Sequence, residues 1–455
     1  MGQPSSTQSI KSPDNRKLLR SILALSIPSI VTNVTTPLLG IADVTIAGHM
    51  GSAVFIAAIA VGGSMFNMLY WLFGFLRMGS SGMTAQCFGA GNRKEASAVL
   101  YRALTIAMAI GLAMILLRHP IGNAILDIMD TDADTRGYAE SYYGICIWGA
   151  PAVLGTFALT GWFLGMQNSR APMWVSIFMD VFNVALSLTL VYAFHLGMEG
   201  IATGTLCAQW AGFILGAAIC LTRYGLQRIA LRELIRWQSM KRFFSINVDI
   251  FLRTICLVCV TMWFTRVGAM QGAVMLAVNA LLMQLFTLFS FFMDGFAFSG
   301  EALCGRFIGE GNAASLRATI KMLLKCGAAI ALLFTAIYVT SGTEFIRLLS
   351  DDDAVVTKSA EYFWWAVAIP IAGFTAFTWD GVFIGTTDTR SMLISMAMAT
   401  TVFFAIYSAL FDIMGNHGLW LAFIGYLFTR GAALSVIGRK YFRADYLSDS
   451  PYSAK

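Results

Sequence analysis

The chain has 455 residues, of which 57% are hydrophobic and only 12% are charged. A soluble domain of this length needs more charged surface, so the composition excludes a soluble globular protein. Apolar stretches of about 20 residues, the length that a helix needs to cross a bilayer, recur along the chain. A β-barrel would instead show segments of about 10 alternating residues, which the sequence lacks. We therefore expect an all-α polytopic membrane protein.

Twelve stretches are predicted to span the membrane as helices. Residues 1–20 form a polar tail, and we expect no cleaved signal peptide because no short apolar segment with a small-residue cleavage site follows. Residues 21–222 carry six spans, 223–241 a basic linker, 242–440 six further spans and 441–455 a second tail. The spans are predicted to begin near Ser21, Val54, Ala98, Arg136, Pro172, Gly200, Phe243, Gly272, Ala318, Ser359, Met392 and Leu419.

The positions of the basic residues predict the orientation. Lys and Arg recur in alternate connecting segments, whereas the other segments include the acidic runs "DIMDTDAD" at 127–134 and "DDD" at 351–353. By the positive-inside rule, the basic segments face the cytoplasm. We therefore expect both termini in the cytoplasm and the protein in the plasma (inner) membrane. The bases on that side are Arg93, Lys94, Arg170, Arg223, Arg228, Arg232, Arg236, Lys241, Arg242, Arg306, Arg317, Lys321, Lys325, Arg390, Arg439, Lys440 and Arg443.

The two halves of the chain resemble each other. The run "GAGN" at 89–92 recurs as "GEGN" at 309–312, and "GWFLGMQNSR" at 161–170 recurs as "GVFIGTTDTR" at 381–390, in both cases 220 residues later. Six is an even number of spans, so the two pseudo-symmetric lobes share one topology about an axis along the membrane normal. Transporters bind substrates between such halves and rock one against the other, so the repeat favours alternating access.

An isolated acid stands in the first predicted span, "TTPLLGIADVTIAGHMG". Asp43 has no basic residue within one turn, and a carboxylate at mid-bilayer costs roughly 2.5–3.5 kcal/mol on the insertion scale. Such residues mark ion or proton paths; a hydrated position at the outer helix end is the alternative. Pro37, six residues earlier, predicts a helix kink that protonation could bias, or else has only a packing role.

The fifth predicted span carries a polar face. Asp180, Asn183 and Ser187 are three and four residues apart, so they share one side of a helix, and Thr205 of the sixth span could add a hydroxyl. Desolvation among neutral hydrogen-bonding neighbours would make Asp180 easier to protonate. Contacts between helices explain the neutral residues equally well, but not a charged aspartate. We predict that Asp43, Asp180, Asn183 and Thr205 form a site for proton or cation coupling.

The second lobe offers further acids. Asp249 and Arg253 are four residues apart and are expected to form a structural ion pair on one helical face. Asp294 and Glu301, which are seven apart, share a face, and Asp380 opens the second copy of a repeated segment. These three acids are secondary candidates for binding a proton or a cation, because they lack the context that supports Asp43 and Asp180.

Little in the sequence indicates an enzyme. It has no nucleophile elbow or cofactor fingerprint, its four histidines are well separated, and its eight cysteines match neither metal nor disulfide spacing. We expect no enzymatic activity, no cofactor and no metal. The expected partners are the lipid bilayer and small drug-like molecules rather than nucleic acid, and the protein is expected to be monomeric.

Four segments together resemble the multidrug and toxic compound extrusion (MATE) family, in particular its DNA-damage-inducible F (DinF-type) branch. They are "PLLGIADVTIAGHMGS", "LRMGSSGMTAQCFGAGN", "GWFLGMQNSRAPM" and "AVNALLMQLFTLFSFFMDGFA". The resemblance implies a V-shaped antiporter of twelve helices, which expels amphiphilic, often cationic compounds in exchange for protons or sodium ions. It further implies that Asp43 is the essential acid of the first helix, Asn183 the asparagine of the fifth-helix site and Thr205 its partner in the sixth.

Two departures from the family pattern bear on the site. Branch members commonly have an aspartate four residues after that asparagine, where this chain has Ser187; its acid, Asp180, lies one turn earlier. Sodium-coupled relatives have a glutamate inside the seventh helix, where this chain has Arg253 and no acid between 254 and 266. Asp380 does resemble the tenth-helix acid of those relatives. We therefore expect protons as the coupling ion, with sodium as the alternative.

A lipid or lipid-linked oligosaccharide flippase of the same two-lobe architecture is the alternative function. Its substrate would favour a cavity lined with Arg and Lys. Nearly all the bases of this chain are instead expected in cytoplasmic loops, so we rank multidrug efflux first.

Overall fold

The computed structural model describes residues 14–443 apart from 51–52, 130–132, 235, 343, 348–349 and 351. Within this part of the chain all regular secondary structure is helical, and twelve helical segments are long and apolar enough to cross a membrane. Each begins within six residues of its predicted start; at the first span, for example, the helix begins at Asn15 instead of Ser21. The all-α fold with twelve candidate spans is therefore confirmed.

The first six spans come from the helices before the linker. The second span consists of α2 and α3, the fourth of α6, η1 and α7, and the fifth of α8 and a π turn, η2. The bounds are α1 Asn15–Gly48, α2 Ala53–Leu72, α3 Phe75–Gly89, α4 Arg93–Leu116, α5 Arg118–Met129, α6 Ala133–Cys146, η1 Ile147–Gly149, α7 Ala150–Gly165, α8 Arg170–Leu188, η2 Thr189–Ala193 and α9 Gly197–Tyr224.

The last six spans follow the short helix α10, Leu231–Leu234. Because α11 already begins at Trp237, the segment between the membrane helices is shorter than the predicted 223–241. The bounds are α11 Trp237–Met270, α12 Ala273–Gly309, α13 Ala313–Ser341, α14 Glu344–Arg347, α15 Asp353–Gly385, α16 Thr389–Met414, α17 Asn416–Gly438 and η3 Arg439–Phe442.

The repeated glycine–asparagine runs form the same turn in both halves. Gly91 and Gly311 follow the ends of α3 and α12 with φ of 67° and 69°, a left-handed conformation that favours glycine. The next residue in each run caps the following helix: the side chain of Asn92 accepts from the amide of Glu95, and that of Asn312 from the amide of Ser315. The sequence repeat is therefore also a structural repeat.

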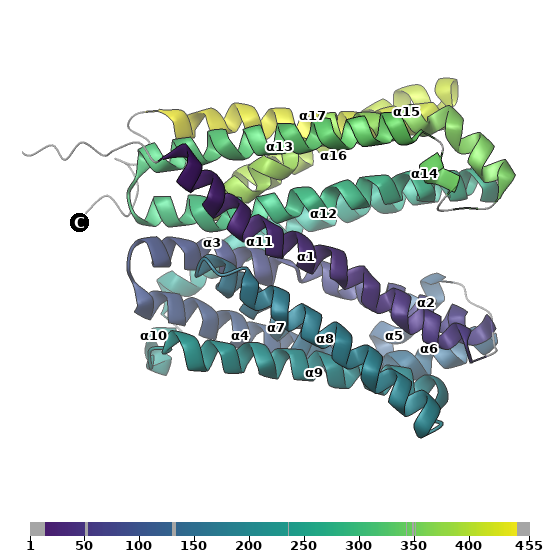
Figure 1. Ribbon diagram of the computed structural model, residues 1–455, viewed down its shortest axis with the longest axis horizontal. Coiled ribbons are helices and arrows are strands. Elements are labelled where there is room, and N and C mark those ends of the chain that lie inside the picture. The colour runs from purple at the N-terminus through teal and green to yellow at the C-terminus, as the bar shows by residue number, and fades with distance from the viewer. Residues whose placement is uncertain are drawn as a thin grey trace, which may run out of the picture.

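Two helices pack on both lobes. The first turns of α1 bury Leu18, Ile22 and Leu25 in a hydrophobic cluster with residues of α12, α13 and α15, whereas Ile46 near its end packs with α2 and α6. Figure 1 shows α1 (purple) running from the upper group of helices, beside α13, to the lower group, beside α2. In return, the first half of α11 packs Phe243 against α3, α4 and α7.

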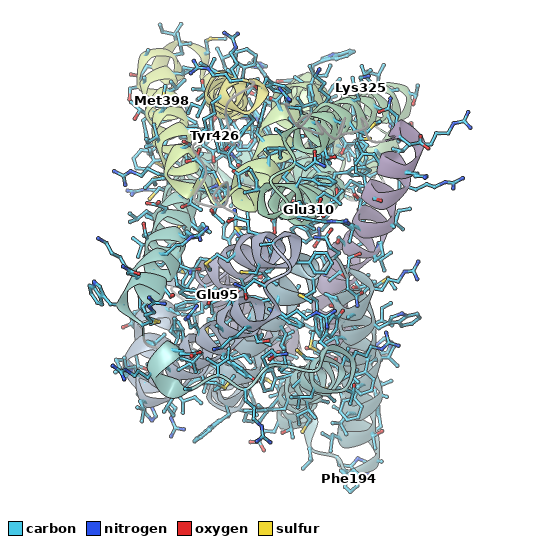
Figure 2. The ribbon with its side chains drawn as sticks, turned by 90° about the vertical axis from the view of Figure 1, so that its left-hand side faces the viewer. Glu95, Phe194, Glu310, Lys325, Met398 and Tyr426 are labelled. Carbon is cyan, nitrogen blue, oxygen red and sulfur yellow. The ribbon has the colours of Figure 1, made fainter. Side chains whose placement is uncertain are left out.

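This exchange differs from the predicted division of the chain at 21–222 and 242–440. The apolar pattern of a helix shows which residues are buried, but not which neighbour covers them. We call the helices from α2 to α9 the N-lobe and those from α12 to α17 the C-lobe. The end of the molecule at which α1 begins and α17 ends is called the terminal end; Figure 2 looks onto it, with Glu310 of the C-lobe close to the boundary with the N-lobe.

Glycines allow the two lobes to approach closely at the terminal end. A Cβ atom at Gly89 of α3 would lie 1.9 Å from the carbonyl oxygen of Arg306 in α12, and one at Gly309 would lie 2.0 Å from that of Gln86 in α3. A Cβ atom at Gly82 would lie 2.1 Å from the carbonyl oxygen of Ile384 in α15. Small residues let membrane helices pack backbone against backbone in this way.

Substitution of Gly82 tests this packing. Gly82→Ala places a methyl group against backbone, which forces α3 away from α15 at a cost of about 1–3 kcal/mol. We expect a lower unfolding temperature in detergent. The matched control is Gly63→Ala in α2, where the added Cβ would have no atom within 4 Å. That control should be neutral or slightly stabilising, because alanine favours helix over glycine by about 1 kcal/mol. Equal unfolding temperatures for the two variants would contradict the close contact.

Candidate functional site

Asp43 lies in a buried polar site made by three helices. Its carboxylate oxygen Oδ2 accepts a hydrogen bond from Thr205 Oγ1 of α9 at 3.1 Å, and Thr205 Oγ1 accepts one from Asn183 Nδ2 of α8 at 2.9 Å. Asp43 is only 3% exposed, and no Lys, Arg or His of the described residues forms an ion pair with it. The structure thus brings together three of the four residues predicted to form the first site.

The backbone around Thr205 fixes this arrangement. Gly204 allows α9 to approach α8, because a Cβ atom there would lie 2.2 Å from Ser187 Oγ. The Thr205 hydroxyl also lies 3.1 Å from the carbonyl oxygen of Ile201, one turn earlier on α9, which orients the side chain. The Tyr142 hydroxyl of α6 is another polar group close to the Asp43 carboxyl. Four helices therefore contribute to the surroundings of one acid.

Several acceptors at this site have no partner. Asp43 Oδ1, Asn183 Oδ1 and Ser187 Oγ are buried and form no hydrogen bond with any described residue. A desolvated carboxylate that is surrounded only by neutral groups carries an electrostatic cost, which a bound proton or cation removes. The site is thus suited to take up one positive charge.

Asp180 lies at a second position where α8 and α1 meet. It is partly buried and interacts with Thr35 of α1, eight residues before Asp43, which corresponds to about 12 Å along a helix. Its Oδ2 atom is buried and has no hydrogen-bond partner among the described residues. The predicted polar face of α8 therefore contacts α1 at two levels, with Asn183 beside one acid and Asp180 forming the other.

Pro37 lies between these two levels. The helix α1 is continuous from Asn15 to Gly48 and passes through Pro37, whose side chain is exposed. Proline has no amide hydrogen, so the carbonyl of Asn33 lacks its helical hydrogen bond. A bend of α1 at Pro37 stays a prediction.

In the C-lobe, Asp380 of α15 pairs with two arginines, Arg253 of α11 and Arg430 of α17, and all three residues are buried. The predicted ion pair between Asp249 and Arg253 is therefore wrong. Asp249 instead accepts a hydrogen bond from Thr389 Oγ1 at 3.1 Å and lies 3.6 Å from Arg390 Nη1. The spacing allows the predicted pair, but Asp249 is already bound by Thr389 and Arg390 of α16, and Arg253 reaches Asp380 on α15 instead.

A second ion pair joins the lobes. Glu301 of α12 pairs with Arg77 of α3 through contacts of 3.1–3.4 Å, and it also accepts a hydrogen bond from Ser81 of α3. Asp294, two turns earlier on α12, feels the charges of Arg77, Arg253 and Arg430. The three secondary acids thus lie in one cluster with three arginines, and the formal charges balance.

Two members of this cluster were missed by the sequence analysis. Arg77 and Arg430 lie inside membrane spans, so the expectation that nearly all bases lie in loops is incomplete. A signal was present, since each arginine interrupts an apolar or small-residue run, "FLRMGSSG" and "YLFTRGAAL". An intramembrane arginine calls for a partner in the same way as an intramembrane acid.

Comparison with known proteins agrees with this architecture. A family model described as MatE matches residues 28–189 and again 249–410, one match in each half of the chain. The chain belongs to the MatE family. The double match also confirms the internal duplication of this MatE protein, and the family is one of transporters.

Its relatives include bacterial proteins of the same length. The DNA damage-inducible protein F of Escherichia coli K12 is 33% identical over 427 residues, which are 93% of each chain. The multidrug resistance protein MdtK of Edwardsiella ictaluri is 24% identical over 421 residues, 89% of this chain and 92% of the relative.

Among solved structures, the bent form of the Vibrio cholerae MATE transporter VcmN matches with a TM-score of 0.84 at 15% identity, covering 95% of this chain and 99% of the other. A MOP superfamily transporter of Pyrococcus furiosus gives 0.84 at 17% identity, covering 97% and 100%. At these identities the matches show the fold alone.

Substitution of Thr205 tests the Asp43 site. Thr205→Val keeps the side-chain volume but leaves the Asn183 amide and the Asp43 carboxylate without their shared partner, at a cost of about 1 kcal/mol. We expect a lower unfolding temperature in detergent. The control is Thr222→Val on the same helix, where the exposed hydroxyl bonds only to carbonyl oxygens of its own helix. The site would be in doubt if both variants lost the same stability.

Proposed function

We propose that this protein is a secondary active exporter that exchanges protons for amphiphilic or cationic organic compounds by alternating access. The observation that carries the proposal is the Asp43 carboxylate, which is buried in a membrane helix with hydrogen-bonding groups around it but no counter-charge. An acid with a structural role inside a membrane is paired with a cation, whereas a proton carrier must be able to gain and lose its charge.

The surroundings of Asp43 suit a proton. When Asp43 is protonated, its carboxyl becomes a donor as well as an acceptor, and Asn183 offers a buried side-chain oxygen without a partner close to it. When the proton leaves, Thr205 still donates to the carboxylate. Both states of the acid thus have a hydrogen-bonding partner in the site.

The C-lobe acids suit sodium poorly. Asp380, which resembles the tenth-helix acid of sodium-coupled relatives, already faces Arg253 and Arg430, so a sodium ion at that carboxylate would meet two guanidinium charges. Glu301 is likewise neutralised by Arg77. These pairings support protons over sodium as the coupling ion.

The packing of α1 suggests how the acid acts on transport. Its first turns pack with the C-lobe, and its second half binds the N-lobe through Asp43 and Thr205. A change of charge at Asp43 alters how strongly the N-lobe binds α1, which also packs on the C-lobe. Protonation therefore shifts the equilibrium between the two arrangements of the lobes. We assign the terminal end to the cytoplasm because the basic connecting segments lie there.

The substrate class rests on the relatives, which include a protein named for multidrug resistance. A flippase for lipid-linked anions is supported by one observation, the arginines Arg77, Arg253 and Arg430 inside the membrane spans. Each of them faces a carboxylate, so the cluster offers no free positive lining for a phosphate head group. The structure therefore gives drug efflux the better support.

Substitution of Asp43 tests the proposal. Purified protein in liposomes should move protons when a cationic dye is added, with sodium absent, and Asp43→Asn should reduce this signal to that of protein-free liposomes because the amide cannot carry a proton. The control is Asp412→Asn, an exposed aspartate in α16, which should keep wild-type rates. Undiminished proton movement in Asp43→Asn would refute the proposal, and a strict sodium requirement would redirect it to the alternative ion.

Substitution of Asp380 separates a structural acid from a coupling acid. Asp380→Asn leaves two buried guanidinium groups with no carboxylate between them, and breaking such a buried pair costs about 3–5 kcal/mol. We expect a large drop in unfolding temperature in detergent, while Asp43→Asn should unfold at or above the wild-type temperature. The opposite order of stabilities would show that Asp380, and not Asp43, carries the unneutralised charge.

A further inference from the structure

The contact between α3 and α12 has the symmetry of the sequence repeat. Ser81 and Glu301 are equivalent positions, 220 residues apart, and their side chains are hydrogen-bonded to each other. The contacts at the ends of the two helices are equivalent in the same way, since Gly89 lies against the carbonyl of residue 306 and Gly309 lies against that of residue 86. Residues that contact their own equivalents lie on the pseudo-twofold axis, so this axis passes between Ser81 and Glu301.

The charged residues beside this axis are not the same in the two lobes. Glu301 stands where the N-lobe has Ser81, and Arg77 stands where the C-lobe has Ala297. The pair of Arg77 and Glu301 is consequently made once rather than twice. Among the described residues it is the one ion pair that joins the N-lobe to the C-lobe.

The side chain of Arg77 makes its polar contacts with α12 of the opposite lobe. Its guanidinium makes a forked contact with both oxygens of Glu301, and its carbon Cζ lies 4.0 Å from the centre of the Phe298 ring, also on α12. The hydrogen bonds of its side chain all go to Glu301 within the described part of the chain. Glu301 is 1% exposed, so the pair is shielded from solvent.

We propose that Arg77 and Glu301 form a latch that closes the terminal end of the transporter and must part in each cycle. The pair can exist only while α3 and α12 are in contact, and alternating access requires that contact to open. The proposal rests on the alternating access of the proposed function, but not on the identity of the coupling ion.

Arg253 of α11, which pairs with Asp380 of the C-lobe, offers Glu301 a second partner in the opened state. Arg253 is close enough to feel the charges of Glu301 and Asp294. When Arg77 withdraws with the N-lobe, Glu301 stays beside the Arg253 guanidinium, which pairs with Asp380 of the C-lobe, and this lowers the cost of breaking the ion pair. Without Arg77, the three acids face Arg253 and Arg430 alone, so Arg253 reduces the cost of opening but does not restore the charge balance.

Hydrogen exchange of the reconstituted protein tests the latch. Glu301→Gln and Arg77→Gln should each speed amide exchange by about tenfold in the last turns of α3 and α12 and the turns that follow them, residues 82–92 and 302–312, because the closed arrangement loses its ion pair. Exchange in residues 396–423 of the C-lobe core should stay unchanged, which shows that the variant is folded. The charge exchange Arg77→Glu with Glu301→Arg should restore slow exchange.

The matched control is Glu310→Gln, which removes a glutamate from the same end of the molecule. Glu310 directly follows α12 and pairs with Arg306 of that helix, and both are partly exposed, so exchange at the lobe contact should remain at the wild-type rate. If the reversed pair proves too unstable to purify, Arg77→Lys, which keeps the charge but not the fork, should give an intermediate rate. Wild-type exchange in both single variants would overturn the latch. The measurement needs neither substrate nor proton gradient, so this result would leave the proposed exchange standing.

Discussion

A membrane helix that carries a charge needs a partner for it inside the protein, because the surrounding hydrocarbon offers neither water nor counter-ions. In the C-lobe the chain supplies its own partners: Asp380 has two arginines and Glu301 has one. In the N-lobe Asp43 has only hydroxyl and amide groups around it. The same constraint therefore leaves paired acids in one lobe and an unpaired acid in the other, and because of this difference we propose Asp43 as the coupling acid.

The reciprocal packing of α1 and α11 connects the Asp43 site to both lobes. The helix α1 begins against the C-lobe, where it buries Leu18 and Ile22. Its equivalent α11 begins against the N-lobe, where it buries Phe243. Two bodies that were joined only by a loop could respond independently. Here a helix that binds the N-lobe near its end also packs on the C-lobe at its start, so the lobes share one element whose position both of them bias.

Much of this organisation could be predicted from the sequence. Length and hydropathy suffice for twelve spans, and an acid without a base marks Asp43, because both signals are local. The partners of Asp249 and Arg253 could not be predicted, since an arginine side chain reaches several helices and its partner depends on which helices pack beside it. The same holds for Arg77 and Arg430, whose acids lie far away in the chain. Spacing within one helix contains no information on contacts across helices.

The glycines between the lobes have a consequence for the kinetics of opening. Gly82, Gly89 and Gly309 place backbone directly against backbone, so few side chains have to find a rotamer when the surfaces meet. An interface of interlocking side chains would lose conformational freedom at every closure and would regain it at every opening. A surface made of helical backbone keeps one shape in both states. The alternating access that we propose would therefore need no search for the correct fit at each closure.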